Sequence, residues 1–356
     1  MKKQNLLLRL TAIAVLSIFS LESFADIWRV NNNAAYNNWA NRQVFDNLTL
    51  AVNTAAPGDT LYIESSGINY GTLTISKQLT ILGTGYFLNQ NTGKQNNSQP
   101  SSVLDLVFDA NSSGSYVSGL EVVGNGYFGD FVLNNITIDR CYFPHSFPGA
   151  GIIFTNYTNT LTNIVISRNY IESNILPVNG AIAGQVANLI VTNNRVGGAI
   201  VFITTCTGTI AQNAIGNGFN IDSGINFYNN IVINGPVVQN TNSSSNIFNN
   251  VFSFSQPSLP WLVGGNNNFG VPYADIFDVT TIPTTDGILK LKPIGDCPQC
   301  YQGFPGGTVE VGVKGGNEPY ILSGIPNIPS IYNLQAPANA PQGENLPVNV
   351  STRSNN

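Results

Sequence analysis

The chain has 356 residues, of which 42% are hydrophobic and 9% are charged, well below the roughly one quarter that is usual in globular proteins. Few charges together with abundant Asn, Gly, Thr and Ser favour turn-rich β structure over helices. Acidic residues exceed basic residues, 19 against 14, and an acidic chain is a poor candidate for binding nucleic acid. We therefore expect no nucleic-acid partner.

Residues 1–25 have the pattern of a secretory signal peptide. A positively charged start precedes an apolar stretch over residues 10–19, and Ser23-Phe24-Ala25 forms an A-x-A-like cleavage site before Asp26. The apolar stretch is too short for a membrane-spanning helix, and no later stretch is longer. We expect an exported protein in the periplasm, on the outer surface or outside the cell, with no transmembrane segment after cleavage.

Residues 26–56 are predicted to form an N-terminal segment and a capping helix. The helix is expected over residues 44–56, before a turn at Pro57-Gly58-Asp59-Thr60. A short amphipathic helix would shield the open edge of a first β coil. Apolar residues recur there at helical spacing: Phe45, Leu48, Val52 and Ala55.

A short phrase, an aliphatic strand that runs into a turn, recurs six times within residues 57–255. Its last residues are 28, 25, 19, 17 and 20 positions apart, a period that suits one coil of a β-solenoid. The sequence therefore predicts an all-β fold, a single-stranded right-handed parallel β-helix over residues 57–255. The last residues of the six phrases are Cys141, Asn169, Asn194, Asn213, Asn230 and Asn250.

The asparagine column predicts an internal ladder. An Asn side chain carries one acceptor and two donors, so stacked copies can bond both the turn backbone and the next Asn along the stack. Cys141 would take the first rung as a small buried substitute. Glycosylation or metal binding is the alternative explanation for so many asparagines.

Residues 44–255 resemble the pectin lyase-like right-handed parallel β-helix proteins. The similarity lies in the capping helix, the turn at Pro57-Gly58-Asp59-Thr60, the strand pairs that close on Gly83-Thr84-Gly85, and the asparagine column. It concerns the fold, which does not by itself imply function. The resemblance implies that a second, Gly-opened strand in each coil belongs to the sheet whose outer face carries catalysis in the enzymes. These strands are expected at residues 151–154, 180–183, 198–202, 218–221 and 235–238.

Residues 256–356 are predicted to form a partial coil, a cap over the last rung and an irregular extended tail. Residues 286–293 are the candidate for the partial coil, and the order of motifs after residue 311 resembles the ending of uncharacterised secreted bacterial β-helix proteins. Cys297 and Cys300 form one isolated C-x-x-C pair, which favours a local disulfide over redox catalysis or zinc binding. Cys206 falls within the coils and is expected to be buried.

The catalytic motifs of the resembled enzymes are missing. The clustered Asp residues of the pectate lyases are absent, as are the Gly-His-Gly and Arg-x-Lys motifs of the polygalacturonases. Asp105 and Asp109 flank Phe108, but no carboxylate run has the spacing of Ca²⁺ ligands, so no metal or cofactor is expected.

The densest charge lies on three successive coils and supplies the candidate site residues. If the protein is an enzyme, the catalytic candidates are Asp139, Arg140, Arg168 and Glu172. The ligand-binding candidates are Tyr142, Tyr170, Arg195 and His145. The alternative is solvated turn charge and inward aromatic ladders. Tyr228 and Phe248 share a second aromatic column.

These patterns favour an exported, non-catalytic β-helix protein that binds glycans or a cell-envelope partner. The second hypothesis is a divergent polysaccharide lyase or glycoside hydrolase that acts on an acidic polysaccharide. The expected partner is accordingly a polysaccharide or a cell-envelope protein.

Overall fold

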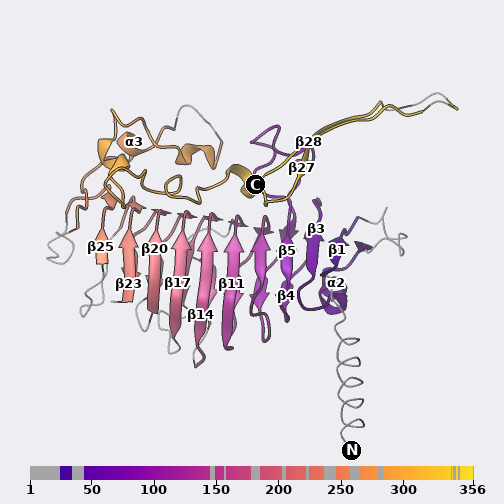
Figure 1. Cartoon of the computed structure of the whole chain (residues 1–356), viewed down its shortest axis with the longest axis horizontal. Helices are drawn as coiled ribbons and strands as arrows, with labels where there is room; N and C mark the ends of the chain where they lie inside the picture. The colour runs from indigo at the N-terminus through magenta and orange to yellow at the C-terminus, as the bar shows by residue number, and fades with distance from the viewer. Residues whose placement is uncertain are drawn as a thin grey trace, which may run out of the picture.

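The computed structural model describes residues 25–33, 44–144, 149–155, 158–177, 185–202, 206–221, 224–235, 246–256, 265–279, 284–337, 339, 342–343 and 345–355. These residues form three sheets of parallel strands stacked along one axis, together with an antiparallel hairpin (Figure 1). From residue 80 to residue 221, each coil passes through sheet A, turns into sheet C and returns through sheet B, as β11 (Leu133–Asp139), β12 (Tyr142–Phe143) and β13 (Ala150–Phe154) do before β14 (Leu161–Ser167). The predicted all-β parallel solenoid is confirmed.

The strands pair in register from coil to coil. Sheet A has the order β2 (Val44–Phe45), β1 (Ile27–Val30), β3 (Thr60–Ile63), β5 (Thr80–Leu82), β8 (Tyr116–Ser118), β11 (Leu133–Asp139), β14 (Leu161–Ser167), β17 (Val186–Thr192), β20 (Cys206–Ala211), β23 (Gly224–Tyr228) and β25 (Asn246–Phe248). Sheet B has the order β22 (Phe219–Ile221), β19 (Ile200–Phe202), β16 (Asn174–Pro177), β13 (Ala150–Phe154), β10 (Gly126–Phe128), β7 (Leu106–Phe108) and β4 (Leu73–Ile75). Sheet C has the order β26 (Val251–Phe252), β24 (Ile231–Val232), β21 (Ala214–Ile215), β18 (Arg195–Val196), β15 (Tyr170–Ile171), β12 (Tyr142–Phe143), β9 (Glu121–Val122) and β6 (Ser102–Val103).

The core is the apolar interior that the three sheets enclose. Side chains alternate between the core and the outer face, as the period of two in a strand requires. In sheet B, for example, Phe108, Phe128 and Phe154 point inward and stack, with ring centroids 5.0 and 4.7 Å apart. The Gly-opened strands expected at residues 151–154, 198–202 and 218–221 correspond to β13, β19 and β22. Residues 180–183 and 236–238 lie outside the described residues.

The capping helix is shorter than the sequence predicted. Helix α2 (Leu48–Thr54) begins after Asn47, whose side chain accepts the Leu50 N–H at 2.9 Å, and it packs Leu48, Ala51 and Val52 into the core. Phe45, assigned to the helix by its spacing, instead lies in β2 at the edge of sheet A. Strand β1 also precedes the helix and pairs with β3, so sheet A begins upstream of the cap.

The turn from sheet A to sheet C has a recurrent left-handed residue. The residue before each ladder position has φ between 52° and 58°. Asn tolerates this region better than other residues with a side chain, because its short polar group bonds locally. The residues at this position are Arg140, Arg168, Asn193, Gln212, Asn229 and Asn249.

The tail, defined here as residues 265–355, first adds a partial coil and then runs back along the stack. Asn268 forms a parallel bridge with Val251, so a partial coil follows residue 255. Residues 286–293, the predicted position, instead contain the 3-10 turn η4 (Gly287–Leu289) and an antiparallel bridge between Phe277 and Leu291. That prediction was wrong because Leu289 and Leu291 pack into a second apolar cluster, outside the solenoid core.

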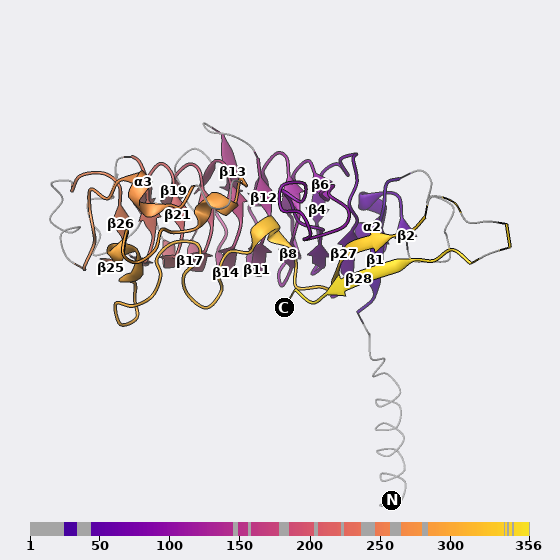
Figure 2. The same cartoon turned by 90° about the horizontal axis from the view of Figure 1, so that it is seen from above.

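This second cluster joins the tail to the outer face of sheet C. In Figure 1 the tail lies above the ends of the sheet A strands, and Figure 2 shows it from above. The tail therefore covers the side of the stack, and its first residues also lie over the last rung, where Phe269 stacks on Phe252 with ring centroids 4.8 Å apart. Its other elements are α3 (Tyr273–Ile276), η5 (Pro298–Tyr301), η6 (Leu322–Gly324), and the hairpin strands β27 (Ser330–Gln335) and β28 (Asn349–Arg353).

Cys297 and Cys300 form the expected local disulfide, and both are fully buried in the second cluster. Within the described ranges, no helix combines the length and apolar character needed to cross a bilayer.

Candidate ligand-binding groove

The asparagine column forms a continuous ladder inside the turn. The Oδ1 of Asn194 accepts the main-chain N–H of Asn169 at 2.9 Å and its Nδ2 at 2.9 Å, while the Nδ2 of Asn194 donates to Oδ1 of Asn213 at 3.0 Å. Cys141 ends the ladder, and its N–H donates to Asn169 Oδ1 at 2.8 Å. The same pattern links Asn213, Asn230, Asn250 and Asn267.

Asn267 is a further rung, beyond the six repeated phrases. It lies 17 residues after Asn250, within the range of the other repeats, so the spacing alone could have identified it. The ladder residues from Asn169 to Asn250 are fully buried. Their bonding groups are directed at the turn backbone, so the column stabilises the coils and presents nothing to a ligand.

Asp139 and two arginines, predicted as candidate catalytic residues, meet in a closed ion cluster. Asp139 is fully buried at the end of β11. Nε and Nη2 of Arg168 donate to its two carboxylate oxygens at 2.7 and 3.0 Å, and Nε of Arg140 lies 3.4 Å from Oδ2. Tyr116 and Ser167 also donate their hydroxyl hydrogens to this carboxylate, at 2.8 and 3.0 Å.

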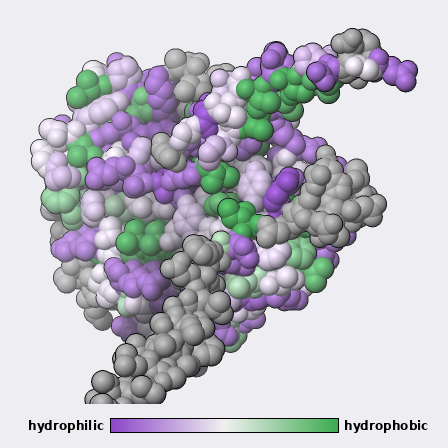
Figure 3. Space-filling model, turned by 45° about the vertical axis from the view of Figure 1, so that its right-hand side comes forward, coloured by the Kyte–Doolittle hydropathy of each residue, from purple (hydrophilic) through white to green (hydrophobic). Residues whose placement is uncertain are grey.

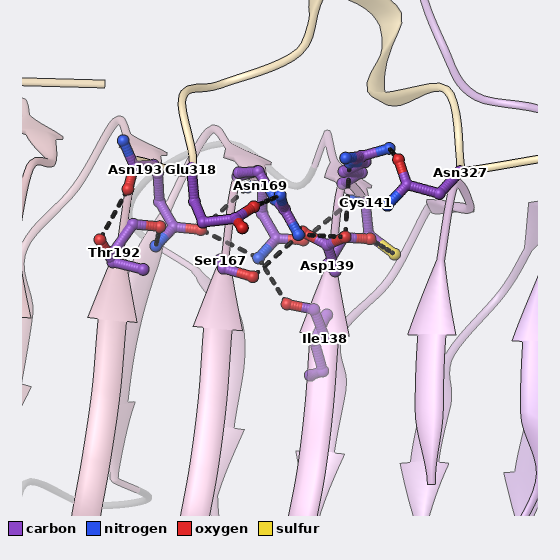
Figure 4. Close-up of polar contacts among 12 residues, drawn as sticks. Ile138, Asp139, Cys141, Ser167, Asn169, Thr192, Asn193, Glu318 and Asn327 are labelled. Atoms are coloured by element: carbon purple, nitrogen blue, oxygen red, sulfur yellow. Dashed lines mark hydrogen bonds and ion pairs between the residues drawn. The ribbon is translucent and has the colours of Figure 1, made fainter. Parts of the chain in front are cut away.

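The tail closes this cluster from outside. Nη1 of Arg140 donates to the carbonyl oxygen of Ile325 at 2.8 Å and to Oδ1 of Asn327 at 2.6 Å, and Arg168 pairs with Glu318. Figure 4 shows Glu318 and Asn327 reaching from the tail toward the strand ends. A polysaccharide could contact Asp139 only if the tail moved away.

The electrostatics of the two arginines follow from this burial. Burial lowers the pKa of Arg140 below its ordinary value, and the charge of Asp139 only partly opposes the shift. Burial also acts to lower the pKa of Arg168, but its hydrogen bonds to Asp139 and the charge of Asp139 outweigh it and raise the pKa. Both guanidinium groups therefore serve to hold the tail on the coils.

The predicted aromatic binding column is covered. Tyr142 and Tyr170 are register partners, with ring centroids 5.8 Å apart, and Phe87 packs against both. Tyr170 is 4% exposed within the second cluster, and burial raises its pKa to about 12. Arg195 is the register partner of Tyr170 in β18.

Glu172 follows the same strand as Tyr170. Burial raises its pKa, and the charge of Arg195 opposes this shift. Among the described residues, neither Glu172 nor Arg195 contacts the cluster of Asp139, Arg140 and Arg168. His145 lies outside those residues.

An open groove of about 570 Å³ lies between the outer face of sheet A and the tail. Its floor is the outward side of three neighbouring strands, β17, β20 and β23, and its two walls are the left-handed turn residues and the tail. The floor residues are Ile190, Thr192, Thr209, Ala211 and Tyr228, with Asn188 at one side. The walls contain Asn193, Gln212 and Asn229, and Phe304, Pro305, Val309, Gly316, Asn317 and Glu318.

An aromatic stack ends at this groove. The rings of Tyr228 and Phe248 are stacked, with centroids 5.0 Å apart and planes 12° apart. Phe304 of the tail packs edge-on against both rings, at 5.7 and 5.4 Å. Because Ala211 is the register partner of Tyr228 on the side away from Phe248, no large side chain of the column faces that side of the Tyr228 ring.

The turn column supplies polar groups at the rim. The side chain of Asn193 donates to the carbonyl oxygens of Val313 and Gly315, and Asn229 bonds both the N–H and the C=O of Phe304. Gln212, between them, is 6% exposed, and its buried Oε1 has no hydrogen-bond partner among the described residues.

The described lining of the groove is mostly uncharged. Glu318 is the one carboxylate among its described lining residues, and glycoside hydrolysis requires two, roughly 5–10 Å apart. Thr192, Thr209 and Asn317 line the groove with hydroxyl and amide groups. In the part of the chain that the structure describes, no cluster of three or more His, Cys, Asp or Glu side chains could hold a metal ion.

The repeat spacing predicts the Tyr228–Phe248 column but not the groove. The floor threonines follow from the strand register, whereas the opposite wall comes from a tail segment about 75 residues further along the chain than Asn229. Comparison with protein-family models, with curated proteins and with solved structures finds no match to this chain, so its function has to be inferred from the geometry of the groove.

Proposed function

We propose that this protein is an exported, non-catalytic carbohydrate-binding protein, and that the groove between sheet A and the tail holds part of a neutral polysaccharide. The observation that supports this most is the aromatic stack that stops at the groove. One face of Tyr228 is covered by Phe248, and the other faces the small side chain of Ala211. A sugar ring placed there would continue the stack, with its hydroxyl groups next to Thr192 and Thr209.

The charges of the groove favour a neutral ligand. The one ionised side chain among its described lining residues is Glu318, which already pairs with Arg168. A polyanion would meet this carboxylate without a cationic lining residue to offset it. The alternative of an enzyme acting on an acidic polysaccharide therefore has weaker support, since its candidate residues Asp139 and Arg140 are closed off by the tail.

Three further parts of the proposal rest on the sequence and on general rules. Export rests on the signal-peptide pattern of residues 1–25. The right-handed sense of the coil rests on the strong preference of parallel crossover connections for that hand. The relationship to pectin lyase-like proteins rests on the motifs between residues 44 and 255.

A cell-envelope protein is the second candidate partner, and the C-terminal hairpin favours it. Strands β27 and β28 form a two-stranded ribbon, and Figure 3 shows hydrophobic side chains along it. β27 is bonded to Asn96 through Ile331 and Leu334, so β28 is the edge strand that can accept a further strand from a partner. Exposed apolar residues on its strands are Ile331, Leu334 and Val350, and Leu346 and Val348 lie just before β28.

The groove proposal is tested by quantitative binding to a panel of neutral and acidic polysaccharides. Loss of the ring in Tyr228→Ala is expected to weaken binding by about 2- to 12-fold, the equivalent of about 0.5–1.5 kcal/mol for one aromatic contact. Ala211→Phe should also weaken binding, because the added ring occupies the space of the sugar. Tyr127→Ala is the matched control, since Tyr127 is a half-buried aromatic on the outer face of sheet B.

The thermal unfolding midpoint of each variant separates lost binding from lost folding. Two results would overturn the proposal: no neutral polysaccharide binds, or binding is sensitive to Tyr127→Ala and insensitive to both groove variants. Release of reducing or unsaturated sugars from any polysaccharide would refute the non-catalytic part.

A further inference from the structure

Asp59 is a nearly buried carboxylate at the start of the solenoid, directly after the capping helix. It lies in the turn between α2 and β3 and is 3% exposed. Its Oδ2 accepts Nε1–H of Trp28 at 2.7 Å and the N–H of Ala56 at 2.8 Å, and its Oδ1 accepts the main-chain N–H of Asp26 at 2.9 Å. All three donors are neutral groups in the unprocessed chain.

Asp26 is held at this turn by both of its main-chain polar groups. Besides the bond from its N–H to Asp59, its carbonyl oxygen accepts the N–H of Thr60 at 2.8 Å. Strand β1 then continues in register along β3, from Ile27 opposite Thr60. The position of the Asp26 nitrogen is therefore fixed by the first strand pair of the solenoid.

The same residue follows the predicted signal cleavage site, Ser23-Phe24-Ala25. Hydrolysis by a signal peptidase adds water across the peptide bond between Ala25 and Asp26. Ala25 leaves with a new carboxylate, and the Asp26 nitrogen becomes an α-amino group that takes up a proton. One neutral N–H donor is thus replaced by an ammonium group with three donors and a positive charge.

We propose that Asp59 is the receptor for the processed N-terminus: after cleavage the α-ammonium group of Asp26 forms an ion pair with the Asp59 carboxylate and fastens β1 to the first coil. The site fits this role because the carboxylate is already ionised at neutral pH. Burial acts to raise the pKa of Asp59, but the hydrogen bonds from Trp28, Asp26 and Ala56 and the charge of Lys77 outweigh it and lower the pKa. A charged, nearly buried acceptor gains most from a charged donor.

The proposal has a defined pH dependence. A carboxylate partner raises the folded-state pKa of the α-ammonium group above its ordinary range of about 7.7–8.0. The extra stability is therefore fully present below about pH 7.7 and is lost as the pH rises through the raised value.

The test starts from the full chain exported by a bacterial host and processed there. Mass spectrometry of the purified protein should find Asp26 as the first residue. Acylation of the α-amino group is then followed against pH. At pH 7 the acylation rate of the wild type should be lower than that of Asp59→Asn, by about threefold for each half unit by which the pKa of the α-amino group is raised. Asp46→Asn, which changes an exposed carboxylate on the same segment, should acylate at the wild-type rate.

A second comparison keeps the test valid if Asp59→Asn folds poorly. A chain made to begin at Ala25 retains every side chain but moves the ammonium group by one residue, so its unfolding midpoint should fall below that of the processed protein. The proposal is overturned if the mature chain begins elsewhere, if the wild-type α-amino group titrates in its ordinary range, or if the chain beginning at Ala25 is equally stable.

Discussion

Asn213→Ala probes the ladder at its centre. The Nδ2 of Asn213 donates to the carbonyl oxygens of Val191 and Ala211 and to Oδ1 of Asn230, each at 2.9 Å. Its Oδ1 accepts the main-chain N–H of Asn194 at 3.0 Å. The two Nδ2 hydrogens are shared among these three acceptors, and Oδ1 also accepts Nδ2 of Asn194 at 3.0 Å. Alanine therefore removes two donated hydrogen bonds and this accepted one, and it leaves the buried main-chain N–H of Asn194 without its acceptor.

The expected loss follows from these contacts. Each lost bond contributes about 1 kcal/mol net, and an unsatisfied buried N–H costs about 1–3 kcal/mol. We expect the free energy of unfolding to fall by about 4–6 kcal/mol, a large part of the stability of a typical domain. Urea unfolding followed by circular dichroism measures it, provided that the slope against urea is unchanged.

Asn246→Ala is the matched control for this experiment. Asn246 is also a stacked asparagine, but it is exposed, and its Nδ2 makes one bond, to Oδ1 of Asn226 at 2.9 Å. Water can replace that bond, so the loss should stay below about 0.5 kcal/mol. If the two variants lose the same stability, buried hydrogen-bond satisfaction is not what the column provides.

Three further predictions concern the buried groups beneath and beside the tail. Asp139→Asn leaves two arginines without their shared counter-charge and should lower the free energy of unfolding by about 3–5 kcal/mol. Glu318→Gln changes a side chain that is 65% exposed and should lower it by less than about 1 kcal/mol. Equal losses in urea unfolding would refute a closed cluster. Burial raises the pKa of Tyr86 and of Tyr320 well above 10.0, so as the pH rises the unfolded chain loses these protons before the folded chain does. The free energy of unfolding should therefore fall above pH 10, by up to about 1.4 kcal/mol per pH unit for each tyrosine. Tyr86→Phe should reduce that slope, and a slope equal to the wild type would contradict the assignment. Burial also raises the pKa of the Cys141 thiol to about 12, so iodoacetamide at pH 8 should spare it in the folded protein and modify it in urea, as peptide mass spectrometry can show.

The coils could be predicted from the sequence because their determinants are periodic along the chain. Each ladder residue bonds the next one only 17 to 28 residues away, so the interaction leaves a visible column. The hidden seventh rung, Asn267, follows the same rule. The expected helix was too long because helical spacing in a short stretch also suits a two-residue edge strand such as Val44–Phe45.

The groove could not be predicted because one of its walls comes from contacts without any period. The Tyr86 and Tyr320 hydroxyls bond across 234 residues, and Arg140 reaches Ile325 across 185. Nothing in the local pattern of charge distinguishes Arg140, which the tail buries, from a solvated turn residue. The candidate cluster of Asp139, Arg140 and Arg168 was thus brought together as its spacing implied, but its accessibility depended on a distant segment.

The tail also changes the order in which the molecule can be completed. A stack of repeats whose coils contact only their neighbours can fold and fray from either end, one unit at a time. Here the last quarter of the chain bonds coils that are made much earlier: Asn91 bonds Asp286, and Tyr86 bonds Tyr320. The surface of the early coils that the tail covers therefore stays exposed to solvent until the C-terminal residues have been synthesised. Once the tail has packed, it contacts several coils at the same time. Local unfolding of one of these coils therefore requires the tail to lose its contacts with the others.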